Sequence, residues 1–235
     1  EKLFCLIKSL GVVTNFYRPD EINDLDNYKW APLLSVPSLI GVKAINEIDY
    51  TSYIPINKDL KAKWKDLLDV ESRPIIGLNW QGNQNAEVFN LKGRSTNLEV
   101  FSELLTDNSF TLLSLQKGYG SDQLNDCTFK DRFVGCQEKI NAAWNFDEIA
   151  AIISNCDILV TTDTAIAHLA GAIGHTCWLI LNKVPDWRWG LIGETTFWYP
   201  SIRIFRQEDE GDWGRVIQRI SGEMKKELKR INKSA

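Results

Sequence analysis

The segment from Thr161 to Gly171 holds the residues best suited to binding a phosphate group. It reads Thr-Thr-Asp-Thr-Ala-Ile-Ala-His-Leu-Ala-Gly, with a strand-like run before it and helical spacing after residue 164. The start of a helix offers unpaired N–H groups and a partial positive charge, and small residues there let a phosphate approach closely. Thr164 and His168 lie four positions apart, so they share one helix face and add a hydroxyl and a ring nitrogen. The segment therefore predicts a diphosphate site at a turn from strand to helix.

A simpler interpretation of the same residues is structural. Asp163 is a good helix-capping residue, and a single histidine is more often a partly buried packing residue than a ligand-binding one. On these residues alone, this interpretation is at least as good as the phosphate site. The elements around the segment and its wider context have to decide between the two.

Strand-like and helix-like runs alternate from Pro74 onward. The expected strands from there on are Ile75–Trp80, Phe110–Leu115, Ile158–Thr162, Cys177–Leu181 and Ile202–Phe205, and the expected helices are 97–106, 146–155 (capped by Asn145), 164–173 (ended by Gly174) and a last helix that begins at Asp212. Before Pro74, the apolar pair Val12-Val13 is expected to form a strand and residues 58–69 a helix. Nearly continuous apolar strands that alternate with helices predict an α/β fold, a Rossmann-like parallel sheet with helices on both faces. Such sheets bind ligands at the carboxyl ends of their strands, which is where the Asp163 turn lies.

Composition excludes several classes of function. The net charge is −4 and the sequence pI is about 5.4, which disfavours nucleic-acid binding because that needs a basic surface. The five Cys form no C-x-x-C pair, so neither a disulfide framework nor a zinc site is expected. There is no signal peptide and no apolar run long enough to span a bilayer, so we expect a cytoplasmic protein.

The stretch from Asp163 to Leu169 resembles the Asp-Thr-x-x-x-His-Leu signature of bacterial heptosyltransferases, the glycosyltransferase family 9 type. The chain is most similar to heptosyltransferase-like domains that follow tetratricopeptide repeats. The collinear motifs that support this resemblance are Pro32 to Pro37, Trp80-Gln81-Gly82-Asn83, Arg94-Ser95, Leu115-Gln116-Lys117, Pro185 to Trp189, Trp198-Tyr199-Pro200, Phe205-Arg206-Gln207 and Gly211-Asp212-Trp213. The match runs from about residue 30 to 220, and several motifs in consistent order are more specific than any one of them.

The resemblance implies the C-terminal, donor-binding half of a GT-B type glycosyltransferase. We expect residues 1–57 to be the remnant of an N-terminal, acceptor-side α/β domain, 58–73 a linker helix, and 74–235 the nucleotide-sugar-binding domain. The chain begins at Glu1 inside a helix-like run, so we expect a missing part on the N-terminal side, either an N-terminal domain or tetratricopeptide repeats. The implied substrate is a nucleotide-diphosphate sugar, with an unidentified glycan, lipid-linked or protein acceptor.

The same resemblance assigns donor contacts to residues of this chain. Asp163, Thr164, Ala165 and His168 match the family turn that contacts the diphosphate and the sugar, although the family has Gly where this chain has Ala165. Arg94 and Lys117 are expected to be cations that offset the charge of the phosphates. The donor cleft is expected to be lined by Gln81, Gly82 and Asn83. The alternative is that Arg94 and Lys117 are solvated surface cations and that residues 81–83 form an ordinary turn after a strand. No Asp-x-Asp occurs, so neither a metal nor a cofactor is expected, and charge should be offset by a helix N-terminus and basic side chains.

Three questions stay open at the level of sequence. No catalytic base is identified, because Asp20, Glu21, Asp24 and Asp26 are more typical of solvated loop residues. Trp187, Arg188 and Trp189 either pack on a sugar or acceptor, close an interdomain cleft, or simply pack. The last helix carries seven Lys or Arg, which suits a peripheral contact with an anionic membrane but equally a solvated face.

Two other functions compete with a glycosyltransferase. The first is a catalytically inactive nucleotide-sugar-binding or scaffold module attached to tetratricopeptide repeats. The second is a dinucleotide-dependent oxidoreductase, which is disfavoured because no G-x-G-x-x-G follows any strand.

Overall fold

The computed structural model describes residues 3–11, 17, 21–22, 29, 31–32, 35–44, 47, 51–87, 93–105 and 109–234. Before residue 51 it contains two short helices, α1 (Phe4–Ser9) and α2 (Val36–Leu39). The strand expected at Val12-Val13 and the carboxylates of Asp20, Asp24 and Asp26 lie outside the described residues.

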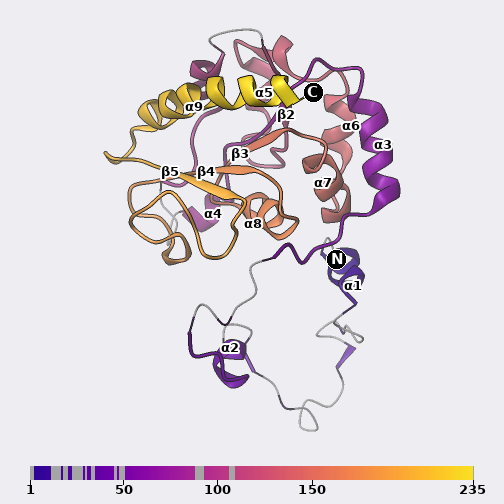
Figure 1. The fold of residues 1–235 in the computed structure, drawn as a ribbon, viewed down its shortest axis with the longest axis vertical. Coiled ribbons are helices and arrows are strands. Elements are labelled where there is room, and N and C mark those ends of the chain that lie inside the picture. The colour runs from indigo at the N-terminus through magenta and orange to yellow at the C-terminus, as the bar shows by residue number, and fades with distance from the viewer. Residues whose placement is uncertain are drawn as a thin grey trace.

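The centre of the molecule is a sheet of five parallel strands in the order β2-β1-β3-β4-β5 (Figure 1). The strands are β1 (Ile75–Asn79), β2 (Thr111–Ser114), β3 (Ile158–Thr162), β4 (Cys177–Leu181) and β5 (Ile202–Arg206). All five coincide with predicted strands, and the Rossmann-like α/β prediction is confirmed. The runs are almost wholly buried because helices cover both faces, which is why they read as continuous apolar segments.

The strand order creates a crossover between β1 and β3. The chain moves outward from β1 to β2 and then returns to the other side of β1 to form β3. The connections that leave these two strands therefore diverge, and a crevice opens at their carboxyl ends. In open α/β sheets this switch point is where ligands bind.

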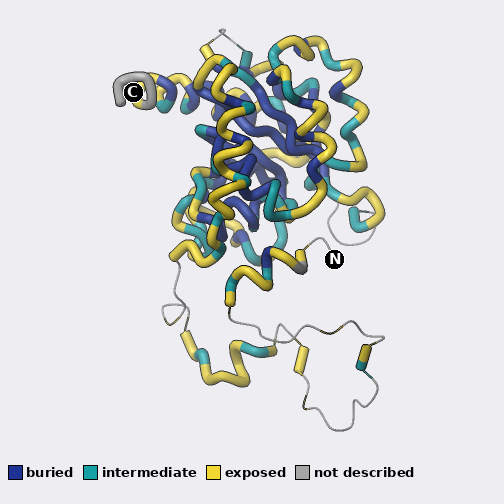
Figure 2. Tube along the Cα trace, turned by 90° about the vertical axis from the view of Figure 1, so that its right-hand side faces the viewer, coloured by how far each residue is buried: buried dark blue, intermediate teal, exposed yellow. Residues whose placement is uncertain are grey.

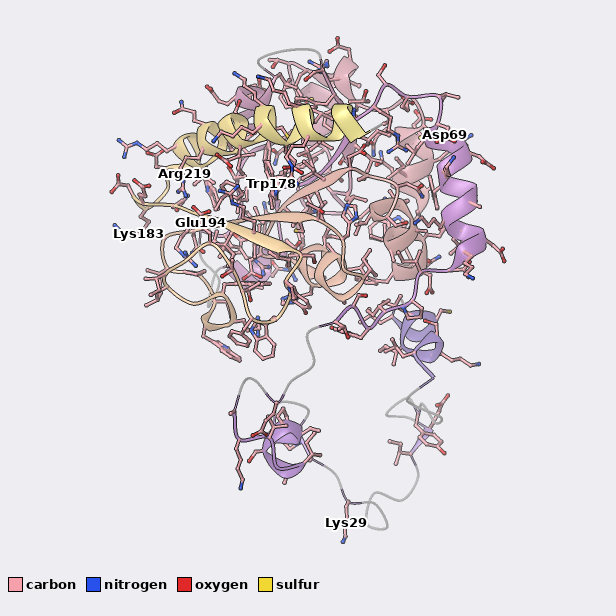
Figure 3. All side chains as sticks on the ribbon, in the orientation of Figure 1. Lys29, Asp69, Trp178, Lys183, Glu194 and Arg219 are labelled. Atoms are coloured by element: carbon pink, nitrogen blue, oxygen red, sulfur yellow. The ribbon has the colours of Figure 1, made fainter. Side chains whose placement is uncertain are left out.

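Helices cover each face of the sheet, and their side chains form one core with each face. Figure 2 shows buried segments, in dark blue, at the centre of this part of the molecule. On one face pack α3 (Lys58–Leu68), α6 (Gln137–Ala142), α7 (Phe146–Ile153) and α8 (Ala165–Ala172). On the other pack the 3₁₀ helix η5 (Leu98–Leu104), α5 (Gln123–Asp126) and α9 (Trp213–Ser234). Trp178 of β4 lies beneath α9 and contacts the ring of Phe205 (Figure 3). The remaining short helices are α4 (Gln84–Glu87), η6 (Lys130–Arg132) and η7 (Trp187–Trp189).

Helix α3, which was predicted as a linker, is packed into the first core. Its Trp64 and Leu68 are buried, and Lys63 forms an ion pair of 2.8 Å with Glu148 of α7. Asn155, just after α7, donates to the Lys61 carbonyl at 3.0 Å. In the described part of the chain, no helix has the length and apolar character needed to cross a membrane.

Local capping explains where the helices begin and end. The Asn145 side chain accepts from the N–H of Glu148 at 2.7 Å and caps α7, as predicted. Helix α8 is capped by Thr164 and not by Asp163. It ends before Gly174, whose φ of 73° is a left-handed conformation that glycine adopts without strain.

Candidate functional site

A cavity of about 460 Å³ opens at the carboxyl ends of β1, β2 and β3, at the crossover. Its volume lies in the range typical of small-molecule sites. It is lined by Asn79, Gln81, Gly82, Asn83, Arg94, Leu115, Gln116, Lys117, Tyr119, Ala143, Trp144, Phe146, Ile149, Thr164, Ala165 and Ile166. Among these lining residues the charged side chains are Arg94 and Lys117, and none is a carboxylate.

A buried amide, Asn79, joins the two strands at the crossover. Its Oδ1 accepts from the hydroxyls of Thr161 at 3.1 Å and Thr164 at 2.8 Å, while its Nδ2 donates to Gln116 at 2.9 Å. Asn79 is 4% exposed, so these bonds form away from water, where an unpaired amide would be costly. The amide therefore fixes the first turn of α8 against the end of β1.

Gln116, which follows β2, holds the loop after β1 in place. Its Oε1 accepts from Asn79 Nδ2 and from the backbone N–H groups of Trp80 and Gln81, both at 3.0 Å. Its Nε2 donates to the carbonyls of Gln81 at 2.9 Å and Tyr119 at 2.6 Å. Each polar atom of this buried side chain is used, so Gln116 fixes the backbone of residues 80 and 81, where the loop that lines the cavity begins.

Gly82 gives room to Arg94. A Cβ at position 82 would lie 2.5 to 2.7 Å from atoms of the Arg94 guanidinium, so only glycine accommodates that side chain where it is. Arg94 Nε pairs with Glu87 at 3.3 Å and its Nη1 donates to the Asp163 carbonyl at 3.2 Å. Ser95 links the same parts, because its hydroxyl accepts from Gly82 N–H and donates to Glu87. The cation is thereby held between the β1 loop and the start of α8.

Lys117 brings a second cation to the cavity. Its ammonium donates to the Ile140 carbonyl in the last turn of α6. Burial lowers the pKa of Lys117 to about 8, opposed by the negative charge of Glu148. An anion in the cavity would favour the charged form and raise this pKa again.

The rest of the cavity is apolar. Leu115, Ala143, Phe146 and Ile149 come from the end of β2 and the region around the start of α7. Trp144 stands beside them with 49% of its surface exposed, which is unusual for so large a ring. The cavity thus has a polar end at the crossover and an apolar end with an accessible aromatic ring.

The start of α8 faces the polar end. Thr164 Oγ1 accepts from the N–H of Ile166 at 3.3 Å, whereas the N–H of exposed Ala165 has no backbone acceptor among the described residues. The Asp163 carbonyl, not its carboxylate, contacts Arg94. This turn presents the N–H of Ala165 and the positive end of a helix to the cavity, while the Thr164 hydroxyl donates its proton to Asn79.

His168 lies outside the cavity. Its ring stacks on Trp189 with centroids 5.0 Å apart and an interplanar angle of 27°, and its Nδ1 lies 3.1 Å from the Tyr199 hydroxyl. Burial lowers the pKa of His168, while the charge of Asp163 opposes this shift. Tyr199 in turn packs over Gly171, where a Cβ would lie 2.3 to 2.7 Å from its ring atoms.

Most of the residues named from sequence meet in one place. Gln81, Gly82, Asn83, Arg94, Lys117, Thr164 and Ala165 line the cavity, Asp163 contributes its carbonyl behind Arg94, and His168 does not reach the lining. A contact between His168 and a donor stays a prediction. Asn79 and Trp144 were not predicted from the sequence to belong to the site, and Gln116, which follows a predicted strand, was given no role of its own. The signal in the sequence that could have indicated Asn79 and Gln116 was an amide side chain at the end of each of two apolar strands.

Within the described residues, no three His, Cys, Asp or Glu side chains are grouped so as to hold a metal ion.

No protein-family model matches the chain. It is 26% identical over 168 residues to Protein FlbA of Caulobacter vibrioides, an alignment that covers 68% of this chain and 26% of that protein. The chain therefore spans about a quarter of this curated relative.

Two solved structures share the fold. The structure of E. coli ADP-heptose LPS heptosyltransferase II superposes with a TM-score of 0.54 at 15% identity, covering 77% of this chain and 54% of that chain. The glycosyltransferase family 9 structure from Veillonella parvula superposes with a TM-score of 0.56 at 10% identity, covering 83% and 58%. At these identities the likeness shows the fold, and this chain spans little more than half of either structure.

Proposed function

We propose that this chain is the donor-binding part of a glycosyltransferase that transfers a sugar from a nucleotide-diphosphate sugar. The observation that carries the proposal is the cavity at the β1–β3 crossover, whose charged lining residues are Arg94 and Lys117 and which faces the start of α8. A diphosphate is the ligand group that uses both cations and the helix N-terminus together. Support comes from the fold shared with two family 9 glycosyltransferase structures.

The two ends of the cavity suit the two parts of a nucleotide. The diphosphate would lie at the polar end, between Thr164, Ala165 and the two cations. The nucleobase would lie among the apolar side chains, beside the half-exposed Trp144. In this arrangement Arg94, Lys117 and α8 would stabilise the leaving nucleoside diphosphate without requiring a metal ion.

Calorimetry with ADP, UDP, ADP-glucose and UDP-glucose tests the donor site. We expect at least one nucleotide to bind, and Lys117→Met to weaken that binding by about tenfold through loss of a partly buried charge. Lys225→Met, which removes an exposed lysine of α9, is the matched control and should bind as the native chain does. If no nucleotide binds, or both variants bind alike, the proposed site is wrong.

An inactive nucleotide-sugar-binding or scaffold module remains the second candidate. The favouring observation is that no carboxylate lines the cavity, so the described site offers no evident general base. Release of nucleoside diphosphate from the tightest-binding sugar donor separates the two. Binding with release that Lys117→Met slows supports the transferase, and binding without any release by a longer protein that includes this chain supports the module.

A further inference from the structure

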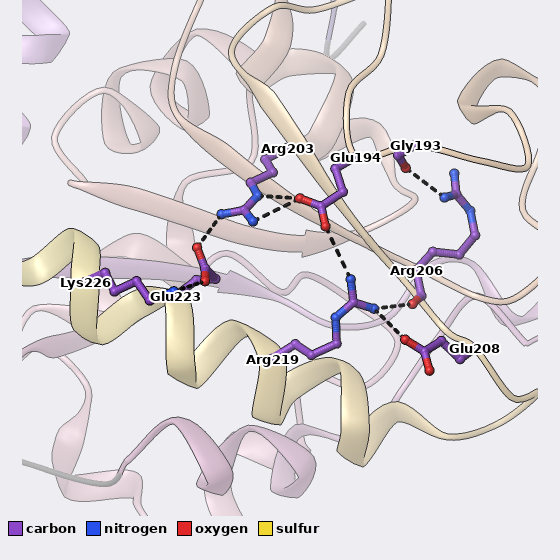
Figure 4. Close-up of polar contacts among 8 residues, drawn as sticks. All are labelled: Gly193, Glu194, Arg203, Arg206, Glu208, Arg219, Glu223 and Lys226. Carbon is purple, nitrogen blue, oxygen red and sulfur yellow. Dashed lines mark hydrogen bonds and ion pairs between the residues drawn. The ribbon is translucent and has the colours of Figure 1, made fainter.

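The loop between β4 and β5 is fastened by one arginine, Arg206, at the end of β5. Its Nη1 donates to the Gly193 carbonyl at 3.0 Å, and its Nη2 donates to the carbonyls of Trp189 at 3.2 Å and Gly190 at 3.1 Å. Figure 4 shows the guanidinium directed at Gly193. Three carbonyls of a single loop are thus held by one planar side chain.

Arg206 differs from its neighbours in what it binds. Arg203 and Arg219 both pair with Glu194, at 2.9 Å and 3.6 Å (Figure 4). By contrast, no carboxylate in the described part of the chain lies within ion-pairing distance of Arg206. Its Nε is buried without a hydrogen-bond partner there, and burial lowers its pKa, although a guanidinium stays charged. Arg206 is therefore a partly buried cation whose N–H groups donate to three backbone carbonyls. We call this set of contacts the Arg206 clamp, because it holds the backbone of the loop in place.

Helix α9 supports the clamp from outside. Arg219 donates to the Arg206 carbonyl at 3.1 Å and lies 3.7 Å from Glu208. Arg203 connects Glu194 of the loop to Glu223 of α9, which it meets at 2.8 Å (Figure 4). The Glu194 carbonyl also accepts from the N–H of Ile204 at 2.8 Å. The loop is therefore tied both to the edge strand of the sheet and to the last helix.

The clamped loop carries the ring that covers His168. Trp189 is 2% exposed and stacks on His168. The adjoining Arg188 carbonyl accepts from the Trp198 indole at 3.0 Å. Because Arg206 holds the Trp189 carbonyl itself, the position of this ring depends directly on the clamp.

We propose that Arg206 is a positioning residue of the donor site, which holds the loop of residues 189–193 so that Trp189 stays stacked on His168. This inference rests on the proposed function, in which the start of α8 binds the diphosphate, because His168 lies on that helix about one turn after Thr164 and anchors it to the loop. Arg206 itself touches neither the cavity lining nor His168, and it acts through the loop.

The protonation of His168 reports on this stack. The charged and titratable groups around it are Asp163, Asp186, Arg188 and Tyr199, and burial is the largest cause that lowers its pKa. A loosened loop would let water reach the ring, and this change raises the pKa of His168 toward its ordinary value of about 6.5 because burial is the largest cause of the lowering. Arg188 and Asp186 are paired and would move away together, so their opposite effects on the pKa of His168 largely cancel.

The test is an NMR titration of the imidazole signals in Arg206→Lys and Arg206→Gln. The chain has two histidines, so both are readily assigned. His175 is partly buried just before β4, where burial lowers its pKa to about 4, and it serves as an internal reference. Arg206→Lys keeps the charge but lacks the planar fork, so a shift there reports lost geometry. Arg215→Gln, an exposed arginine paired with Asp209 and Asp212, is the control.

We expect the midpoint of His168 to rise in both Arg206 variants, more in Arg206→Gln, and to stay unchanged in Arg215→Gln. His175 should titrate alike in all chains. An unchanged His168 in folded Arg206 variants overturns the proposal. So does loss of cooperative unfolding in both, which would show that Arg206 stabilises the whole fold. If the titration midpoint of His168 rises in the Arg206 variants but the native chain binds no nucleotide, the role of Arg206 in holding the loop is supported and the proposed function is refuted.

Discussion

At the scale of single residues, Lys117 has the environment that matters most for the proposed function. Its ammonium is half-buried, faces a cavity without a lining carboxylate, and is held by a helix carbonyl. Partial desolvation makes the charge harder to keep, and an anion in the cavity would restore it. The protonation of Lys117 and the binding of an anion in the cavity are therefore coupled.

This coupling predicts a pH dependence of nucleotide binding. The pKa of Lys117 is lowered to about 8, so the ammonium is present below that pH and lost as pH rises through it. The phosphates are already ionised above neutrality. We expect the affinity for ADP to fall by about tenfold between pH 7.5 and 9.5. Lys117→Arg, which stays charged, should bind equally at both values, and an equal fall in that variant would exclude Lys117 as the cause.

Gln116 offers a stability prediction of a different kind. Gln116→Glu keeps the shape but replaces the Nε2 donor with an oxygen that faces the carbonyls of Gln81 and Tyr119. Unpaired and repelling buried acceptors should cost about 1–3 kcal/mol or more of the free energy of unfolding. Urea denaturation measures this, with Gln218→Glu on the exposed side of α9 as the control. Equal stability of the two variants would mean that Gln116 does not organise the β1 loop.

At the scale of elements, replacing a helix glycine by alanine should have opposite effects on stability in α8 and in α9. Gly171 in α8 lies under the Tyr199 ring, so Gly171→Ala forces that ring to move and should destabilise by about 1–3 kcal/mol. Gly222 in α9 has nothing within 4 Å of an added Cβ, so Gly222→Ala should stabilise by about 0.5–1 kcal/mol. Thermal unfolding distinguishes them, and the same sign for both would contradict the packing of Tyr199 on α8.

The elements themselves were largely predictable from sequence. The strands Ile158–Thr162 and Cys177–Leu181 and the cap at Asn145 follow from local patterns, since long apolar runs and capping residues act locally. The segment predicted as helix 97–106 forms a shorter 3₁₀ helix, and α6 was not predicted at all, because its six residues are too few to show a period. Local pattern alone also could not choose between Asp163 and Thr164 as the cap of α8.

At the scale of the whole molecule, the strand order brings the site together. Residues after β1, β2 and β3 meet because parallel strands end at one edge and because the chain crosses over between β1 and β3. This is why seven of the nine site residues named from sequence, from Gln81 to Ala165, line one cavity. The place of His168 was less predictable, since it depends on Trp189 and Tyr199 from loops whose paths follow no repeating pattern.

The central claim is that a nucleoside diphosphate binds at the crossover with its phosphates on the start of α8. Backbone amide shifts in a ¹⁵N-labelled chain titrated with ADP and with AMP test it most directly. The account predicts the largest difference between the two ligands at the N–H group of Ala165, with little change in α9 and at His175. Shifts centred elsewhere, or identical shifts with AMP and ADP at Ala165, would contradict it.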